Sequence, residues 1–189
     1  FKSEDLRPLP EGAARRSIRA VLQFYDLAFS EKESADYTAG VTLGVLEGDG
    51  AAAAEEHYVL HGWHERVAEE RLDLALVEQI ISRSPDLVGI ELGAYKQAAT
   101  LDLVNRVQRL LAARRCTTAI IGVPVSKDKV FRAQLPAARA RAGLLYVDRK
   151  APWFPAFEAE LLSFPKGQHD DWTDCLSGVT AMAISQPVA

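Results

Sequence analysis

The spacing of apolar residues changes after about the first third of the chain, and this change limits the folds open to it. Before the change, short stretches rich in β-branched and aromatic residues predict strands at residues 18–26, 38–47 and 56–63. A polar loop at 30–36 and a turn at 47–50 join these strands. Strands joined by such short connections predict an antiparallel meander, because parallel neighbours need a long crossover.

The remainder of the chain alternates helices with strands. Apolar residues recur at helical spacing from Val67 to Ile81, and Ser84-Pro85-Asp86 ends that helix. The next predicted elements are a buried parallel strand at 87–92, a helix at 98–115, a strand at 118–125, a helix at 129–142, a short edge strand at 144–147, and helices at 152–162 and 170–184. Pro136 is expected to start, kink or interrupt the helix that contains it.

A meander followed by helix–strand units predicts one α/β domain. Its sheet is mixed, with the antiparallel meander beside parallel strands, and helices flank both faces. The length of 189 residues suits a single domain. The composition, 48% hydrophobic and 25% charged, is that of a globular protein. No apolar run approaches the roughly 20 residues needed to cross a bilayer.

The net charge of −4 conceals a separation of opposite charges along the chain. Residues 55–91 carry nine acids and three bases, residues 105–150 carry eleven bases and two acids, and residues 151–189 carry five acids and one base. The negative net charge argues against nucleic-acid binding, since domains that bind nucleic acid are usually basic. The separation of charges favours nucleic-acid binding, because a basic surface can lie beside an acidic site.

Neither the cysteines nor the histidines form a recognisable zinc motif. Cys116 and Cys175 lie far apart and lack CxxC spacing, which is typical of a protein from a reducing compartment. His57, His61 and His64 lie in one predicted strand, where strict alternation puts His57 and His61 on one face and His64 on the other. We therefore interpret the three as surface histidines rather than zinc ligands.

Acidic residues mark the ends of elements that a sheet of this type brings together. Asp26 ends the first strand, Glu91 lies at the end of the strand at 87–92, and Asp170-Asp171 begins the last helix. If the two strands are parallel neighbours, Asp26 and Glu91 face the same crevice. Gathered carboxylates repel one another unless a hard cation such as Mg²⁺ or Mn²⁺ neutralises them, and two such ions can bind a phosphodiester. Alternatively, Asp170 and Asp171 only cap the helix and Asp26 lies in a turn.

The segment Phe164–Leu176, FPKGQHDDWTDCL, resembles the FP-x-G-x-HDD-x-x-D-x-L signature near the end of the large terminase subunit of tailed bacteriophages. Five further stretches resemble motifs of that family, in the same order. They are Gln23–Ala28 (a strand ending in Asp-x-Ala), Asp36-Tyr37-Thr38, Ile90-Glu91 with Gly93-Ala94, Val125–Ala133 (K-x-x-R-A) and Ala151–Phe164 (E-L-x-x-FP). The resemblance spans residues 18–183 and implies the C-terminal nuclease domain of that subunit, with an RNase H-like fold.

The resemblance implies a metal-dependent endonuclease that cleaves concatemeric double-stranded viral DNA during genome packaging. The implied catalytic and metal-binding residues are Asp26, Glu91, Asp170 and Asp171, with Asp174 as a further metal ligand. The implied cofactor is Mg²⁺ or Mn²⁺, with two ions bound. The implied DNA contacts are Lys127, Lys129 and Arg132, with His169 near DNA or a metal-bound water. Leu92-Gly93 departs from the family, since many relatives have a polar residue after the acid.

A full-length large terminase subunit carries an ATPase motor before its nuclease. The chain contains no G-x-x-x-x-G-K-[ST] motif, and it begins at Phe1 with Met182 as its only methionine. We therefore expect residues 1–17 to be a linker from an absent N-terminal ATPase domain and residues 18–189 to be the nuclease domain. The implied partners of the parent protein are the motor, the portal and the small terminase subunit, acting at the procapsid in the host cytoplasm and without a membrane.

Two other functions are open for this sequence. A junction resolvase or transposase-type nuclease shares the fold and the metal requirement, and a preference for four-way junctions distinguishes it. In a non-catalytic module that docks DNA or the portal, the same acids have a structural role. Failure to bind metal would identify such a module.

Overall fold

Strands β2 (Ile18–Asp26), β3 (Thr38–Leu46) and β4 (Glu56–Glu65) of the computed structural model form the predicted antiparallel meander. Strand β5 (Leu87–Leu92) pairs parallel with β2, and β6 (Ala119–Pro124) pairs parallel with β5. The structure describes residues 1–12, 18–28, 37–47, 54–93, 97–125 and 128–185. Within these residues the sheet has seven strands in the order β1-β7-β4-β3-β2-β5-β6, so the predicted mixed sheet is confirmed.

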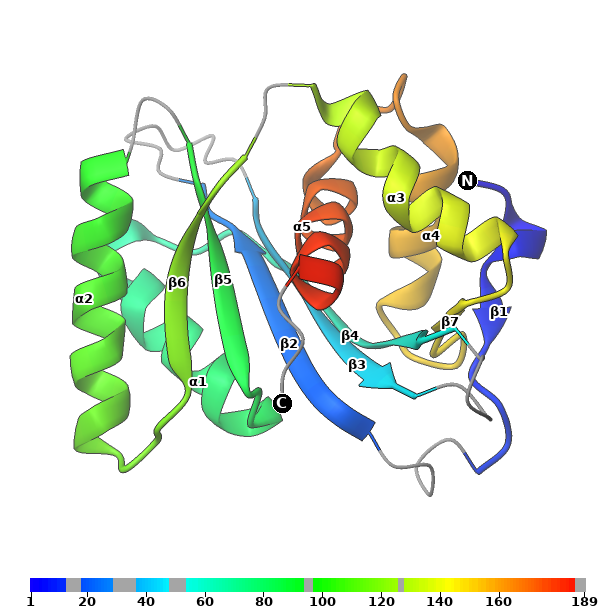
Figure 1. The fold of residues 1–189 in the computed structure, drawn as a ribbon. Helices are drawn as coiled ribbons and strands as arrows, with labels where there is room; N and C mark the ends of the chain where they lie inside the picture. Colours follow the sequence, from blue (N-terminus) through cyan, green and yellow to red (C-terminus); the bar gives the residue numbers. More distant parts are fainter. Residues whose placement is uncertain (13–17, 29–36, 48–53, 94–96, 126–127, 186–189) are drawn as a thin grey trace.

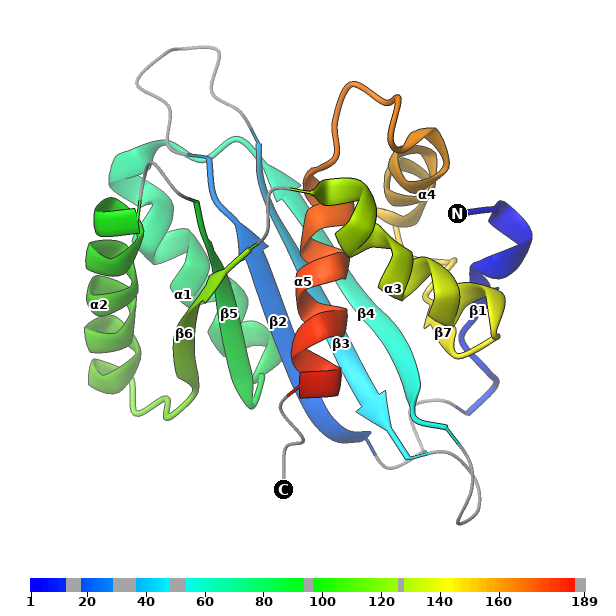
Figure 2. The ribbon, with the colours of Figure 1, turned by 45° about the horizontal axis from the view of Figure 1, so that its top comes forward.

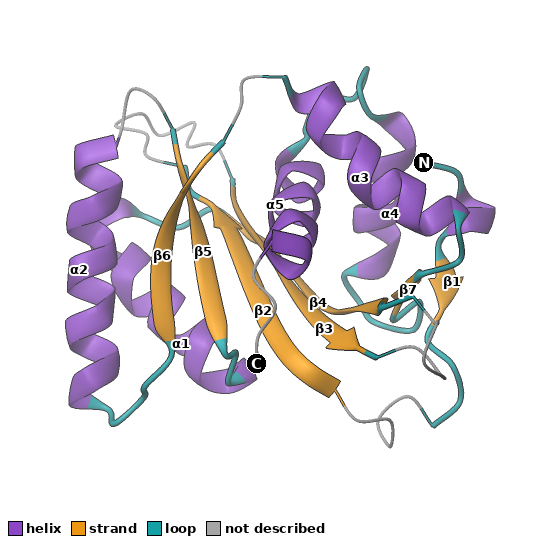
Figure 3. Cartoon of the chain, viewed as in Figure 1, coloured by secondary structure: helices purple, strands orange, loops and turns teal. Residues whose placement is uncertain are grey.

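Helices cover both faces of the sheet (Figures 1 and 3). Helices α1 (Leu72–Arg83) and α2 (Gln97–Ala113) lie on one face. Helices α3 (Lys129–Arg141), α4 (Phe154–Ser163) and α5 (Asp171–Ser185) lie on the other, as Figure 2 shows from a second direction. Each group of helices buries its own apolar core against the sheet. Every residue of β3 is buried, because this central strand is covered on both sides.

Helix α5 approaches the sheet closely at two glycines. A Cβ atom on Gly178 of α5 would lie 2.5 Å from ring atoms of Phe24. A Cβ atom on Gly89 of β5 would lie 2.4 Å from Met182 Sδ. Larger residues at these positions would push the helix away from the sheet. The close approach sets the first turn of α5 beside the ends of β2 and β5, where the acids lie.

Pro136 lies inside α3, which begins at Lys129 and continues past the proline to Arg141. Because proline has no N–H, the carbonyl of Arg132 loses its usual intrahelical partner at this point. Pro136 therefore neither starts nor interrupts the helix, contrary to two of the predicted outcomes. In the described parts of the chain, no helix has the length and apolar character needed to span a membrane.

The first residues of the chain join the sheet. Strand β1 (Arg7–Pro8) pairs parallel with β7 (Leu145–Val147), which also pairs with β4. The side chain of Leu6 is fully buried in the core on the α5 side. These residues belong to the segment 1–17, for which we expect a linker. The prediction of an edge strand at β7 is wrong, because β1, distant in sequence, covers its outer side.

A bulge at Leu60 changes the faces of the three histidines of β4. Leu60 has no partner in the register between β3 and β4, and the extra residue reverses the alternation beyond it. His57 and His64 therefore share the face toward α3 and α5, whereas His61 faces α1 and contacts Arg83. The prediction that His57 and His61 share a face is wrong for this reason.

The side chain of His57 is fully buried, contrary to the surface position predicted for it. His57 Nε2 lies 2.8 Å from Glu55 Oε1 and 3.1 Å from Arg139 Nη2. Burial, together with the positive charge of Arg139, lowers the pKa of His57 to about 4 against the opposing influence of Glu55. The imidazole is therefore neutral in the folded protein at neutral pH.

We expect His57 to disfavour the folded state in mild acid. Unfolding returns the imidazole to an ordinary pKa of 6.5, so between pH 6.5 and about 4 the unfolded chain binds a proton that the folded protein does not. The contribution of His57 to stability therefore falls as the pH falls through this range. His57 alone should lower the free energy of unfolding by about 2 kcal/mol between pH 7 and roughly pH 4.5. Urea unfolding followed by circular dichroism measures this change.

A His57→Gln variant isolates this contribution, because glutamine is polar but does not titrate. When the pH is lowered over the same interval, the free energy of unfolding of this variant should change by about 2 kcal/mol in its favour relative to the unsubstituted protein. His169→Gln is the matched control, since it makes the same exchange at a side chain that is 48% exposed. Equal changes in the free energy of unfolding of the His57→Gln variant and the unsubstituted protein would contradict the prediction.

Candidate metal centre

Asp26, Glu91 and Asp174 come together at the carboxyl edge of the sheet. Asp26 ends β2 and Glu91 lies near the end of β5, and the parallel pairing of these strands sets the two acids side by side. Asp174 reaches the same point from the first turn of α5. Carboxylate oxygens of the three residues all lie within 4.8 Å of one another. The structure thus brings together three of the five acids predicted as metal ligands; the other two are Asp170 and Asp171.

The electrostatics of this group favour a bound cation. Burial raises the pKa of Asp26 to about 7, and the negative charges of Glu91, Asp174 and Asp171 add to the effect. Burial also raises the pKa of Glu91, against the opposing charge of Arg132. Glu91 Oε2 is buried and receives no hydrogen bond from the described residues. A hard divalent cation takes oxygen ligands and removes such repulsion, so these acids fit one.

Two basic side chains of α3 contact the acids. Lys129 Nζ lies 2.8 Å from Asp170 Oδ1 and 2.8 Å from Asp174 Oδ2. Arg132 Nη2 lies 2.5 Å from Asp174 Oδ1. Burial by itself would lower the pKa of Lys129, but its hydrogen bonds to the two aspartates prevail and raise it. Both predicted DNA contacts on α3 are thus ion-paired beside the acids, and Lys127, the third, lies outside the described residues.

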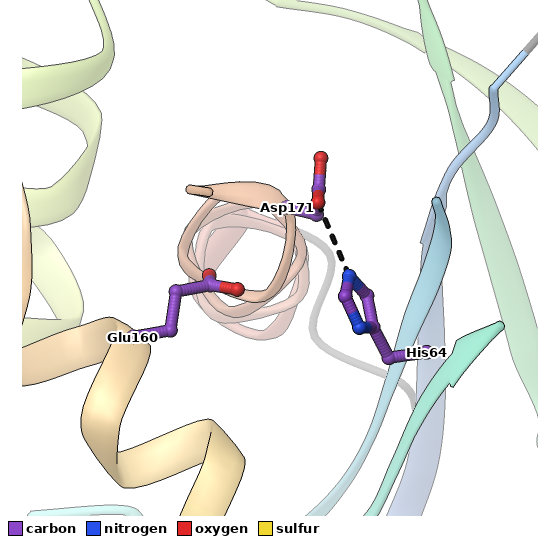
Figure 4. A group of neighbouring side chains, drawn as sticks. All are labelled: His64, Glu160 and Asp171. Atoms are coloured by element: carbon purple, nitrogen blue, oxygen red, sulfur yellow. Dashed lines mark hydrogen bonds and ion pairs between the residues drawn. The ribbon is translucent and has the colours of Figure 1, made fainter. Parts of the chain in front are cut away.

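Asp171 belongs to a second group, with His64 of β4 and Glu160 of α4 (Figure 4). One ligand atom from each of the three lies within 4.8 Å of the others. His64 Nε2 lies 3.1 Å from Asp171 Oδ2, and Figure 4 shows the imidazole pointing at this carboxylate. The His64 ring stacks on Tyr37 at 4.2 Å and lies 4.7 Å from the Trp172 ring, so aromatic packing holds its orientation.

Glu160 is not among the site residues predicted from the sequence. It is 9% exposed, and its Oε1 accepts hydrogen bonds from the N–H of Thr173 at 2.9 Å and from the Thr173 hydroxyl at 3.3 Å. Burial raises the pKa of Glu160, and the bond from the Thr173 backbone opposes this. Phe157 and Leu161 are buried on the same helix. An acid amid the buried positions of an apolar helix is the signal that could have identified Glu160.

Asp170 and His169 lie at the margin of the two groups. The Asp170 side chain is 37% exposed and is held by Lys129. His169 Nδ1 lies 4.0 Å from Asp171 Oδ2. Asp36, which belongs to one of the matched motifs, lies outside the described residues. Of the five predicted ligands, three therefore form the first group, one belongs to the second, and one pairs with a lysine.

Comparison with solved structures finds viral nucleases. The human cytomegalovirus terminase nuclease domain has a TM-score of 0.69 over 96% of this chain and 94% of that chain, at 13% identity. The nuclease domain of the large terminase subunit gp2 of bacterial virus Sf6, with manganese and beta-thujaplicinol, has a TM-score of 0.63 over 94% of each chain, at 14% identity. Fowlpox virus resolvase with Holliday junction DNA has a TM-score of 0.53 over 89% of this chain and 99% of that chain, at 10% identity.

No protein-family model and no curated protein sequence matches the chain. The structural similarity nevertheless extends over nearly the whole of each terminase nuclease domain. The elements that carry the acids, β2, β5 and α5, belong to the mixed sheet and to the helical layer that covers it. The chain therefore has the RNase H-like fold of viral terminase nuclease domains, as the motifs in its sequence predict.

Proposed function

We propose that this chain is a metal-dependent endonuclease that cleaves double-stranded viral DNA, as the nuclease domain of a large terminase subunit. The observation that carries the proposal is the convergence of Asp26, Glu91 and Asp174 within 4.8 Å at the carboxyl edge of the sheet. The fold shared with two viral terminase nuclease domains supports it. The motifs of the large terminase subunit favour concatemeric packaging DNA as the substrate.

The cofactor in this proposal is Mg²⁺ or Mn²⁺, with two ions bound. The ligands are Asp26, Glu91 and Asp174, completed by Asp170 or Asp171. Bound divalent ions supply Lewis acidity, which polarises a phosphodiester and lowers the pKa of a coordinated water. Lys129 binds both Asp170 and Asp174 and so orients these two carboxylates toward one point.

Helix α3 offers positive charge for DNA phosphates next to the acids. Lys129 and Arg132 lie beside Asp174, and the segment 105–150 that contains them carries eleven bases. DNA binding should therefore weaken steeply as the salt concentration rises. The DNA in the Fowlpox virus resolvase structure supports DNA as the partner. For the parent terminase we extend the proposal to an ATPase motor, a portal and a small subunit.

We expect the chain to nick or linearise supercoiled plasmid DNA when Mn²⁺ or Mg²⁺ is present. Excess EDTA should abolish cleavage, because the acids alone provide no Lewis acid for the phosphodiester, and added Mn²⁺ should restore it. Agarose gel electrophoresis of the plasmid over time measures the rate. Cleavage at the same rate in EDTA and in Mn²⁺ would contradict the proposal.

A junction resolvase is the second candidate, favoured by the similarity to Fowlpox virus resolvase. The test compares cleavage of a four-way junction with cleavage of a linear duplex of the same sequence. Faster cleavage of the junction would favour the resolvase, and equal or slower cleavage would favour the terminase nuclease. A chain that binds DNA but neither binds Mn²⁺ nor cleaves would be a docking module.

A further inference from the structure

We propose that His64, Glu160 and Asp171 form a second cation site, which takes a transition-metal ion such as Zn²⁺. Unlike the three acids at the sheet edge, this group contains an imidazole nitrogen. It also draws its residues from β4, α4 and α5, and so connects three elements that are distant in sequence (Figure 4). The inference goes beyond the nuclease function, and it assigns Asp171 to the second site, so that Asp170 completes the first.

The geometry of the group is close to that of a coordination sphere. Ligands of a tetrahedral ion at about 2.0–2.2 Å lie roughly 3.5 Å from one another. His64 Nε2 and Asp171 Oδ2 are 3.1 Å apart, and all three ligand atoms lie within 4.8 Å of one another. The three ligand atoms are therefore close enough to one another to surround a single ion.

A nearly buried carboxylate borders a cavity at this point. Glu160 is 9% exposed, and its Oε1 accepts hydrogen bonds from the N–H and the hydroxyl of Thr173. Glu160 also lines a cavity of about 350 Å³ that His64, His169 and Trp172 border. A buried charge needs a compensating partner, and the cavity has room for an ion with its water ligands.

The donor atoms select the kind of ion. One imidazole nitrogen and two carboxylate oxygens suit Zn²⁺ or Mn²⁺, whereas Mg²⁺ and Ca²⁺ prefer oxygen ligands alone. Three protein ligands leave further positions for water from the cavity. The two groups should therefore differ in preference, with Mg²⁺ favouring the all-carboxylate group and Zn²⁺ favouring the group with His64.

An ion at this site would tie the start of α5 to β4 and α4. Asp174 lies in the same first turn as Asp171, and its N–H donates a 2.9 Å hydrogen bond to the carbonyl of Asp170. Movement of this turn would displace Asp174 from Asp26 and Glu91. The second site thus acts as a clamp that keeps the first group assembled.

Calorimetric titration with Zn²⁺ tests the site in an Asp26→Asn background, which weakens the first group. The Asp26→Asn protein should bind one equivalent of Zn²⁺ at the second site. Adding His64→Phe, which keeps aromatic stacking, or Glu160→Gln, which keeps an acceptor for Thr173, should weaken that binding by more than tenfold. The loss of a ligand should be at least as large as the effect of losing a residue that only supports ligands, which is roughly 10- to 100-fold.

His61→Phe is the matched control, because His61 lies in the same strand on the opposite face and should leave Zn²⁺ affinity unchanged. Circular dichroism verifies that each variant is folded. If His64→Phe is not folded, the Zn²⁺ affinity of Glu160→Gln decides the test. Unchanged Zn²⁺ binding in the folded variants, or no Zn²⁺ binding in the Asp26→Asn protein, would overturn the inference. Plasmid cleavage with Mg²⁺ is measured separately, so the inference and the nuclease proposal can fail independently.

Discussion

Replacing Asp26 with Asn is expected to lower the rate of Mn²⁺-dependent plasmid cleavage by about 10³-fold. The variant loses the carboxylate that lies within 4.8 Å of ligand oxygens on both Glu91 and Asp174. Charge stabilisation by a bound ion contributes several kcal/mol, and about 4 kcal/mol corresponds to three orders of magnitude in rate. Initial rates of plasmid linearisation, compared at equal protein concentration, measure the loss.

The same substitution is expected to stabilise the metal-free protein at about pH 8. The pKa of Asp26 is about 7 in the folded protein against an ordinary value of 3.8, so the folded protein loses stability as the pH rises through this range. Above pH 7, Asn removes the whole free-energy cost of the buried charge at position 26. We therefore expect a gain of about 2–4 kcal/mol in the free energy of unfolding. Near pH 4 the two proteins should be equally stable. Lost cleavage with increased stability would show that the defect is chemical.

Glu70→Gln is the control, since Glu70 is an exposed acid away from both groups, and it should leave both rate and stability unchanged. Mn²⁺ should raise the unfolding temperature of the unsubstituted protein more than that of the Asp26→Asn variant, because the variant binds the ion less tightly. If the Asp26→Asn variant cleaves at the original rate, Asp26 is not a catalytic residue.

Replacing Arg132 with Met is expected to lower the free energy of unfolding by about 3 kcal/mol in the absence of metal. The side chain of Arg132 is 14% exposed and that of its partner Asp174 is 2% exposed, so the ion pair is buried. Met fills a similar volume but leaves the buried carboxylate with one cation fewer. Urea unfolding at neutral pH measures the loss.

The double variant Arg132→Met/Asp174→Asn should recover most of this loss, because it removes the charge together with its partner. Mn²⁺ should also restore stability to Arg132→Met, since the ion supplies the missing positive charge. Arg109→Met, on an exposed position of α2, is the control and should be as stable as the unsubstituted protein. If the single and double variants are equally unstable, lost packing rather than the unpaired charge explains the effect.

Much of the sheet could be predicted from local patterns. The stretches at 18–26 and 87–92 become β2 and β5 with the same bounds, because runs of β-branched and apolar residues between turn signals favour strands wherever they lie. The carboxyl ends of neighbouring parallel strands lie at one edge of a sheet. The proximity of Asp26 and Glu91 therefore follows from the order of the elements.

Features that depend on distant segments could not be predicted in this way. The bulge at Leu60 inserts one residue into β4, and no local pattern reveals whether a strand is regular or bulged. It decides that His64, rather than His61, lies on the face of α5. Glu160 joins His64 only because α4 and β4 both pack beside the start of α5.

By itself, the sequence determined the order of the elements, the mixed sheet and the candidate acids, because these depend on local periodicity and on motifs. Only the tertiary structure decided which acid of the HDDWTD segment joins Asp26 and Glu91. Successive residues of a helix point about 100° apart, so the rotation of α5 about its axis makes the choice. The packing of Gly178 on Phe24 sets that rotation, and it turns Asp174 toward the first group and Asp171 toward the second.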